Sequence, residues 1–118
     1  MRQEKHKPTY PLNEVKEICA NGIFALNGRS ARWIRNHLDR FDTSNIVKEI
    51  VAHIKEDDFY KSVSLDVKPG TWADVYRFVF TDDDELDGDD GWYVKLFVDE
   101  SDRVRLHILS ANWEGYPH

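Results

Sequence analysis

The sequence predicts an α+β domain in which N-terminal helices pack on one face of an antiparallel β-sheet. Apolar residues recur at helical spacing through the first half of the chain, whereas from Val63 onward they alternate with polar residues. The helical segments come first and the strand segments follow one another, which favours an antiparallel meander. With 118 residues, of which 41% are hydrophobic, residues 1–118 are expected to form a single domain without a repeat.

Three helices are expected in the first half. The first ends at Asn21-Gly22, a helix-stop signal, and the second runs from Ser30 to Phe41 with Gly28 and Ser30 marking its start. The third runs from about Thr43 to Ile54, and a short helical turn is expected over Glu56–Ser62. The apolar stripes that define the three helices are, in chain order, Leu12, Val15, Ile18 and Cys19; Ala31, Ile34, Leu38 and Phe41; and Ile46, Val47, Ile50, Val51 and Ile54.

Four strands are expected in the second half, over Val63–Val67, Val75–Thr81, Trp92–Val98 and Val104–Ile108. Pro69-Gly70 turns the chain after the first of them. The tail over 111–118 is expected to be irregular.

Alternation within each strand predicts which side chains share a face. Residues two apart point to the same side, so Tyr93 and Lys95 lie together, opposite the apolar residues of their strand. Arg77 is expected beside Val75, on the face opposite Asp74 and Tyr76. An arginine between valines needs either a phosphate ligand, an ion pair with Asp74 or a loop acid, or an exposed edge.

Composition favours a soluble cytoplasmic protein. No apolar run approaches the roughly 20 residues that cross a bilayer, and the charged N-terminus lacks the apolar core of a signal peptide. The single Cys19 excludes an internal disulfide and suits a reducing compartment. No membrane association is expected.

Negative charge is concentrated in one segment. The formal net charge is −6, but seven acids lie between Asp82 and Asp90, and without them the chain is nearly neutral. A basic face can therefore coexist with an acidic appendage elsewhere. The segment imitates the opening of a calcium-binding loop, but its twelfth position is Val94, where a bidentate glutamate is required, so a calcium site is not expected.

Three segments combine aromatic with cationic side chains, as RNA-binding surfaces do. They are Asp58-Phe59-Tyr60-Lys61-Ser62, the run from Trp72 to Arg77, and Trp92-Tyr93-Val94-Lys95. Lysine and arginine supply fixed charge for phosphates, and aromatic rings supply stacking surfaces for bases.

These segments, together with Glu4-Lys5 and Leu12-x-x-Val15-Lys16, resemble the MqsR family of bacterial toxins; the similarity fades after Ser110. The resemblance implies a RelE-like fold and the activity of a ribosome-independent mRNA interferase. It also implies growth arrest when the toxin is unrestrained, and neutralisation by a cognate antitoxin protein.

The resemblance implies catalytic roles for Lys61 and Tyr93, and the family carries a cation at the position of Arg77. Lys61 would neutralise charge growing on the phosphate oxygens, and Tyr93 would bind the phosphate or move a proton, although a phenol is a reluctant base at neutral pH. The alternative for each is structural: Lys61 and Tyr93 as solvated surface residues, and Arg77 as one half of an ion pair.

Four further residues are candidate RNA contacts: Tyr60 and Trp72 as stacking surfaces, with Tyr76 and Lys95 beside them. One position departs from the family, because Ala73 replaces a functional glutamine that follows the tryptophan. His107 is a candidate acid/base that would compensate; its alternative is a surface histidine in an alternating strand.

No metal or cofactor is expected in the reaction. RNA carries its own nucleophile, the 2′-hydroxyl, so the site must orient it, accept its proton, stabilise the charge on phosphorus and protonate the leaving 5′-oxygen. The products would be a 2′,3′-cyclic phosphate and a 5′-hydroxyl. Two other functions stay open: a non-catalytic relative that binds RNA or protein, and an interaction domain whose acidic segment captures a basic partner.

Replacing Asp82–Asp90 by an Asn-Gly turn should leave the fold intact, because a two-residue turn can join antiparallel strands. RNA affinity, measured by fluorescence anisotropy, should rise or stay level as repulsion is removed, and the gain should shrink with added salt. A shortened protein that folds but no longer binds RNA would place these acids in the site itself.

Overall fold

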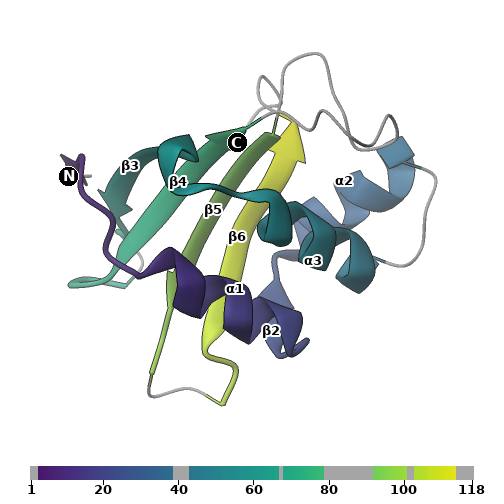
Figure 1. Cartoon of the computed structure of the whole chain (residues 1–118), viewed down its shortest axis with the longest axis horizontal. Helices are drawn as coiled ribbons and strands as arrows, with labels where there is room; N and C mark the ends of the chain where they lie inside the picture. Colours follow the sequence, from purple (N-terminus) through teal and green to yellow (C-terminus); the bar gives the residue numbers. More distant parts are fainter. Residues whose placement is uncertain (1–2, 39–42, 67, 79–91, 101–102, 114–118) are drawn as a thin grey trace.

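The computed structural model describes residues 3–38, 43–66, 68–78, 92–100 and 103–113. Within them three helices cover one face of a six-stranded, mostly antiparallel sheet, which is the predicted α+β class and agrees with a RelE-like fold (Figure 1). The helices are α1 (Leu12–Ala20), α2 (Gly28–Leu38) and α3 (Thr43–His53), followed by the 3-10 turn η1 (Glu56–Asp58). The strands are β1 (Glu4–Lys5), β2 (Phe24–Leu26), β3 (Phe59–Ser64), β4 (Trp72–Phe78), β5 (Trp92–Val98) and β6 (Leu106–Trp113).

The sheet has the strand order β1-β3-β4-β5-β6-β2. Strands β3 to β6 form the predicted antiparallel meander. The two edge strands, β1 and β2, were not predicted, because two or three residues are too few to establish an alternating pattern. β2 runs parallel to β6, so the sheet is not purely antiparallel.

The main core lies between the helices and the sheet. It is formed by buried residues of all three helices and of strands β4, β5 and β6. Trp92 and Tyr76 are the largest side chains in it, and both are fully or almost fully enclosed. The helical stripes face this core as predicted, except that Ala31 is only half-buried and is not part of the core. Phe41 and the side chain of Leu38 lie outside the described residues.

The start of α2 differs slightly from the prediction. Asn27 precedes the helix, and its side-chain oxygen accepts a hydrogen bond from the backbone N–H of Arg29 at 2.9 Å. This is an N-cap, so the helix begins at Gly28. The buried Ser30 hydroxyl then accepts a hydrogen bond from the backbone N–H of Ala111 at 3.3 Å, which fixes α2 against β6.

The predicted helical turn over Glu56–Ser62 is wrong in its second half. Helical geometry is limited to Glu56–Asp58, where the Asp58 carboxylate accepts a hydrogen bond from the backbone N–H of Lys55 at 2.7 Å. From Phe59 the chain is extended, because β3 is hydrogen-bonded between β1 and β4. Cross-strand pairing with β4 overrides the local helical signal.

Strand boundaries also shifted. β4 begins at Trp72 instead of Val75, and β6 continues to Trp113 instead of ending at Ile108. Residues 111–113 of the expected irregular tail therefore belong to a strand, and residues 114–118 lie outside the described residues. The extension of β6 pairs with β5, with Trp92 opposite Trp113. The segment 79–91, which includes the acidic residues, lies outside the described residues.

A second, smaller apolar cluster occupies the face of the sheet opposite the helices. Its buried members are Val63, Leu65, Ala73, Val75 and Phe97. Because side chains alternate along a strand, every second residue of β3, β4 and β5 joins this face, which also carries most of the predicted site residues.

A buried carboxylate attaches the N-terminal segment to the centre of the sheet. Asp74 of β4 has no exposed surface, and its two oxygens accept hydrogen bonds from the backbone N–H groups of Thr9 and Tyr10 at 2.9–3.0 Å. The Tyr10 hydroxyl donates to the Trp72 carbonyl at 2.6 Å. These bonds hold the chain between β1 and α1 against β4.

Replacing Asp74 by alanine should lower the free energy of unfolding by about 3 kcal/mol, because charge-assisted bonds are lost and two backbone donors lose their acceptor. Urea denaturation followed by tryptophan fluorescence measures the change. Asp66→Ala, at an exposed aspartate, is the matched control and should lie within about 0.5 kcal/mol of the parent. Equal stability of the two variants would contradict this role of Asp74.

Candidate functional site

Four of the predicted site residues converge on the face of the sheet opposite the helices. Lys61 of β3 pairs with Val75 of β4, and Val75 pairs with Lys95 of β5. One step along, Arg77 pairs with Tyr93. Val75 belongs to the second apolar cluster and Tyr93 packs against it, so these partners all point away from the helices.

A β-bulge brings a fifth residue to this group. Phe59 pairs with Tyr76 and Lys61 pairs with Val75, so Tyr60 is an extra residue in β3. The Tyr60 ring is exposed, and the Arg77 guanidinium carbon lies 4.6 Å from its centroid. The Lys61 Nζ lies 5.2 Å from the same centroid. We call the surface formed by Tyr60, Lys61, Arg77, Tyr93 and Lys95 the cationic face.

Lys61 has a carboxylate partner that the sequence did not reveal. Its Nζ donates a hydrogen bond to Oε1 of Glu4 at 2.6 Å, and the two side chains are 22% and 47% exposed. The bond to Glu4 raises the pKa of Lys61, which therefore stays protonated at neutral pH. Lys61 is thus held in place by an ion pair at the surface.

Tyr76 is separated from the cationic face. It is 1% exposed on the helix side of β4, where its ring meets that of Phe59 edge-on at 5.7 Å. Burial raises the pKa of its hydroxyl well above the usual range. A base cannot stack on an enclosed ring, so Tyr76 is not brought together with the other predicted RNA contacts.

Trp72 also lies away from the cationic face. Trp72 is the first residue of β4, and because residues two apart in a strand share a face, it lies on the helix side of the sheet with Asp74 and Tyr76. The Lys5 Nζ lies 4.6 Å from its ring centroid. Trp72 and Tyr60 lie on opposite faces of the sheet, so one stretch of RNA on the cationic face cannot stack on both rings.

His107 is remote from Lys61. It pairs with Phe97, and the two rings stack at 4.6 Å between centroids and 6° between planes. Three strand intervals separate β3 from β6, which amounts to about 14 Å. Ala73 is fully buried in β4, two strands from His107, so the His107 ring does not take the place of a polar side chain at position 73.

The possible ion pair between Arg77 and Asp74 is also excluded by alternation. Asp74 points to the helix side, where it binds Thr9 and Tyr10, whereas Arg77 is exposed on the other face. The Arg77 guanidinium lies against the Tyr60 ring, and a planar guanidinium can bind phosphate oxygens through two parallel N–H donors. That arrangement suits a phosphate.

Other chemistry is limited in the part of the chain that the structure describes. No group of three or more His, Cys, Asp or Glu side chains gathers there in a way that would hold a metal ion. Cys19 is buried in the main core, and burial raises the pKa of its thiol to about 11. No described helix is long and apolar enough to span a bilayer.

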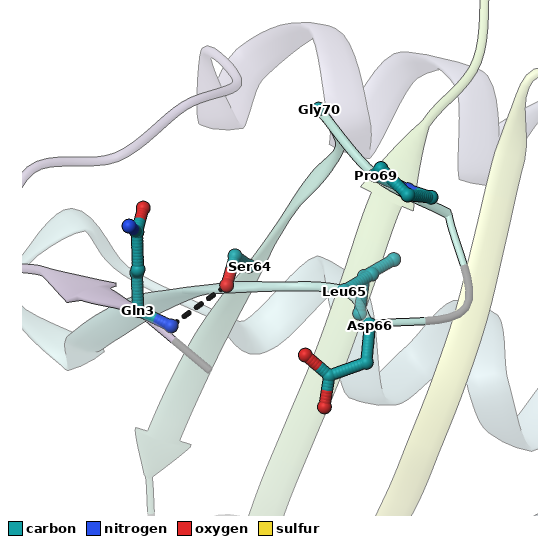
Figure 2. A pocket seen from close by; sticks show the side chains of 6 residues that line it. All are labelled: Gln3, Ser64, Leu65, Asp66, Pro69 and Gly70. Carbon is teal, nitrogen blue, oxygen red and sulfur yellow. Dashed lines mark hydrogen bonds between the residues drawn. The ribbon is translucent and has the colours of Figure 1, made fainter. Parts of the chain in front are cut away.

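The pocket beside the β1–β3 pair is separate from the cationic face. Figure 2 shows its lining residues, Gln3, Ser64, Leu65, Asp66, Pro69 and Gly70. Asp66 is the one charged side chain among them. A pocket lined in this way has no cation for a phosphate, so the candidate site is the open cationic face.

An α+β domain with helices on one face of the sheet and clustered cations and aromatics on the other is the architecture expected of a small RelE-like toxin. The family model described as "Motility quorum-sensing regulator, toxin of MqsA" matches residues 7–110. The chain therefore belongs to the MqsR toxin family of the MqsR–MqsA toxin–antitoxin system. The search of curated proteins found no significant match.

Proposed function

We propose that the protein is a metal-independent, ribosome-independent endoribonuclease that cleaves mRNA and is neutralised by a cognate antitoxin of the MqsA type. The observation that carries this proposal is the convergence of Lys61, Arg77 and Tyr93 from three neighbouring strands on one face. Membership of a family of toxins that are generally ribonucleases supports it.

Lys61 and Arg77 supply the charge that the reaction needs. As the 2′-oxygen attacks phosphorus, negative charge grows on the non-bridging oxygens, and a positioned cation stabilises it. Lys61 has three N–H donors, of which one bonds Glu4, so others can reach a phosphate. Arg77 presents a planar fork that matches two phosphate oxygens.

Tyr93 and Tyr60 complete the proposed site. Tyr93 lies beside Arg77 in the cross-strand register, where its hydroxyl can hydrogen-bond the phosphate or protonate the leaving 5′-oxygen. Tyr60 projects from the bulge with its ring exposed, so a base flanking the cut can stack on it. Lys95 would contact the neighbouring backbone phosphate.

Ala73 favours a second candidate function, a non-catalytic relative that binds RNA or protein. Its methyl group is buried and cannot contact a substrate, although the family resemblance leads one to expect a functional glutamine there. The two functions differ in one measurement, since a binding protein shows salt-dependent RNA affinity without producing new RNA ends.

Lys61→Ala should lower the rate of RNA cleavage about a hundredfold or more, because one electrostatic donor to the transition state is lost. Cleavage of a purified transcript, followed by gel electrophoresis, measures the rate. Arg77→Ala and Tyr93→Phe should show smaller losses, and growth arrest on induced expression should weaken in the same order.

Lys68→Ala is the matched control, because Lys68 is also a surface lysine paired with a carboxylate, that of Asp99. It should cleave RNA like the parent. A folded Lys61→Ala protein that keeps full toxicity and cleavage would show that Lys61 has no part in the reaction.

Cleavage should survive an excess of EDTA, because an ammonium, a guanidinium and a phenol supply the required charge and protons. The expected products carry 2′,3′-cyclic phosphate and 5′-hydroxyl ends. A 5′-hydroxyl end is identified because it cannot be ligated until it has been phosphorylated, and a cyclic phosphate because a cyclic phosphodiesterase opens it. Activity that EDTA abolishes and magnesium or manganese restores would place the protein in another reaction class.

A further inference from the structure

Glu4 lies in the same cross-strand row as the buried Ala73, where a row means the residues that are paired side by side across neighbouring strands. Glu4 of β1 pairs with Val63 of β3, and Val63 pairs with Ala73 of β4. The next row on the same face, two residues along the strands, contains Lys61, Val75 and Lys95. The Glu4 carboxylate therefore reaches the cationic face from the row in which position 73 carries only a methyl group.

Several contacts fix this position of Glu4. The backbone N–H of Gln3 donates to the Ser64 hydroxyl at 2.7 Å, a bond drawn in Figure 2, and the N–H of Ser64 donates to the Gln3 carbonyl at 2.8 Å. Farther along, Thr9 and Tyr10 are bound to Asp74. The strand that carries Glu4 is therefore held at both ends, and Glu4 lies N-terminal to the residues that the family match covers.

The proposed reaction lacks a good base among the predicted residues. Lys61 and Arg77 are cations, a phenol is a poor base at neutral pH, and His107 is remote. A carboxylate is ionised at neutral pH and can accept a proton from a hydroxyl within hydrogen-bond reach. Glu4 is the carboxylate bonded to Lys61, and nearly half of its side chain is exposed.

We propose that Glu4 is the general base of RNA cleavage, acting with Lys61 as a carboxylate–ammonium pair. This inference rests on the proposed ribonuclease function and adds a catalytic residue to it. The substrate it implies is single-stranded RNA with a free 2′-hydroxyl at the cut, because a carboxylate base has nothing to deprotonate in DNA.

The step balances without a co-reactant. The Glu4 carboxylate takes the proton of the 2′-hydroxyl, the 2′-oxygen forms a bond to phosphorus, and the bond between phosphorus and the 5′-oxygen breaks. The Tyr93 hydroxyl gives its proton to the leaving 5′-oxygen. Glu4 then releases its proton to solvent and Tyr93 regains one, so the enzyme is restored and the products are a 2′,3′-cyclic phosphate and a 5′-hydroxyl.

The surrounding charges suit this role. Among the described residues, the charged and titratable groups on the face that carries Glu4 include Tyr60 and Lys61 from β3, Arg77 from β4, and Tyr93 and Lys95 from β5. Farther along the same face, His107 and Lys68 lie against Phe97. Their cations attract the phosphate next to the hydroxyl that Glu4 deprotonates. Lys61 donates to Oε1, which orients the carboxylate for the proton transfer.

The test compares Glu4→Gln with the parent over a pH series. The substrate is a fluorescent RNA oligonucleotide that spans one mapped cleavage site, and the binding probe is the same oligonucleotide with a 2′-deoxy sugar at the cut. Glutamine keeps the size and can still accept the Lys61 hydrogen bond, but it is not a base. Glu100→Gln is the matched control, because Glu100 forms an exposed ion pair with Arg105 at 2.7 Å.

Glu4→Gln should lower the single-turnover rate at neutral pH by about a hundredfold or more and keep the probe affinity within a few-fold of the parent. The fall in rate on the acidic side of the parent's pH profile should be absent in the variant. Glu4→Asp should recover part of the rate, and Glu100→Gln should behave like the parent.

Three results would overturn the role of Glu4 while leaving the ribonuclease function in place. The first is an unchanged rate and pH profile in Glu4→Gln. The second is faster cleavage with tighter probe binding, which would mean that Glu4 only competes with phosphate for Lys61. The third is an equal loss of cleavage and of probe binding, which would mean that Glu4 only positions Lys61. A folded parent protein that binds the RNA without cutting it would overturn the proposed function, and this inference with it.

Discussion

The hydrogen bonds between the buried Asp74 carboxylate and the N-terminal segment are the constraint on which the rest of the structure depends. Burying a carboxylate is costly unless it is hydrogen-bonded, and here the N–H groups of Thr9 and Tyr10 meet that need. Thr9 and Tyr10 lie between β1 and α1, so the same bonds hold the connection between these two elements against β4. Because β1 carries Glu4, a contact on the helix side of β4 also determines what reaches Lys61 on the opposite face.

One face of the sheet contributes mainly to stability, and the other carries the residues of the proposed site. The helix side buries Tyr76, Trp92 and the helical stripes, which supply most of the apolar burial. The other side has a small apolar cluster around Val75 and leaves the cations and Tyr60 accessible. A rigid sheet holds Lys61, Arg77 and Tyr93 one strand apart, so the spacing of the proposed site follows from strand pairing and not from loop conformation.

Much of the fold followed from periodicity. Long periodic segments gave the three helices and strand β5, and alternation correctly placed Tyr93, Lys95 and Arg77 on one face. The failures came from short or irregular elements. β1 and β2 are too short to show a period, and the segment after Asp58 became a strand because β4 supplies its hydrogen-bond partners. The bulge at Tyr60 shifts the alternation by one residue, which no local pattern in β3 records.

Amino-acid types and spacing by themselves determined the α+β class, the family resemblance and the set of cationic and aromatic residues from which a site is drawn. The tertiary structure alone decided which of those residues meet. It enclosed Tyr76, placed His107 three strands away from Lys61, and brought a carboxylate oxygen of Glu4 to 2.6 Å from the Lys61 Nζ across 57 positions of sequence. The reason is physical: alternation fixes which face a residue joins, but which strands become neighbours depends on pairing and burial summed over the whole chain.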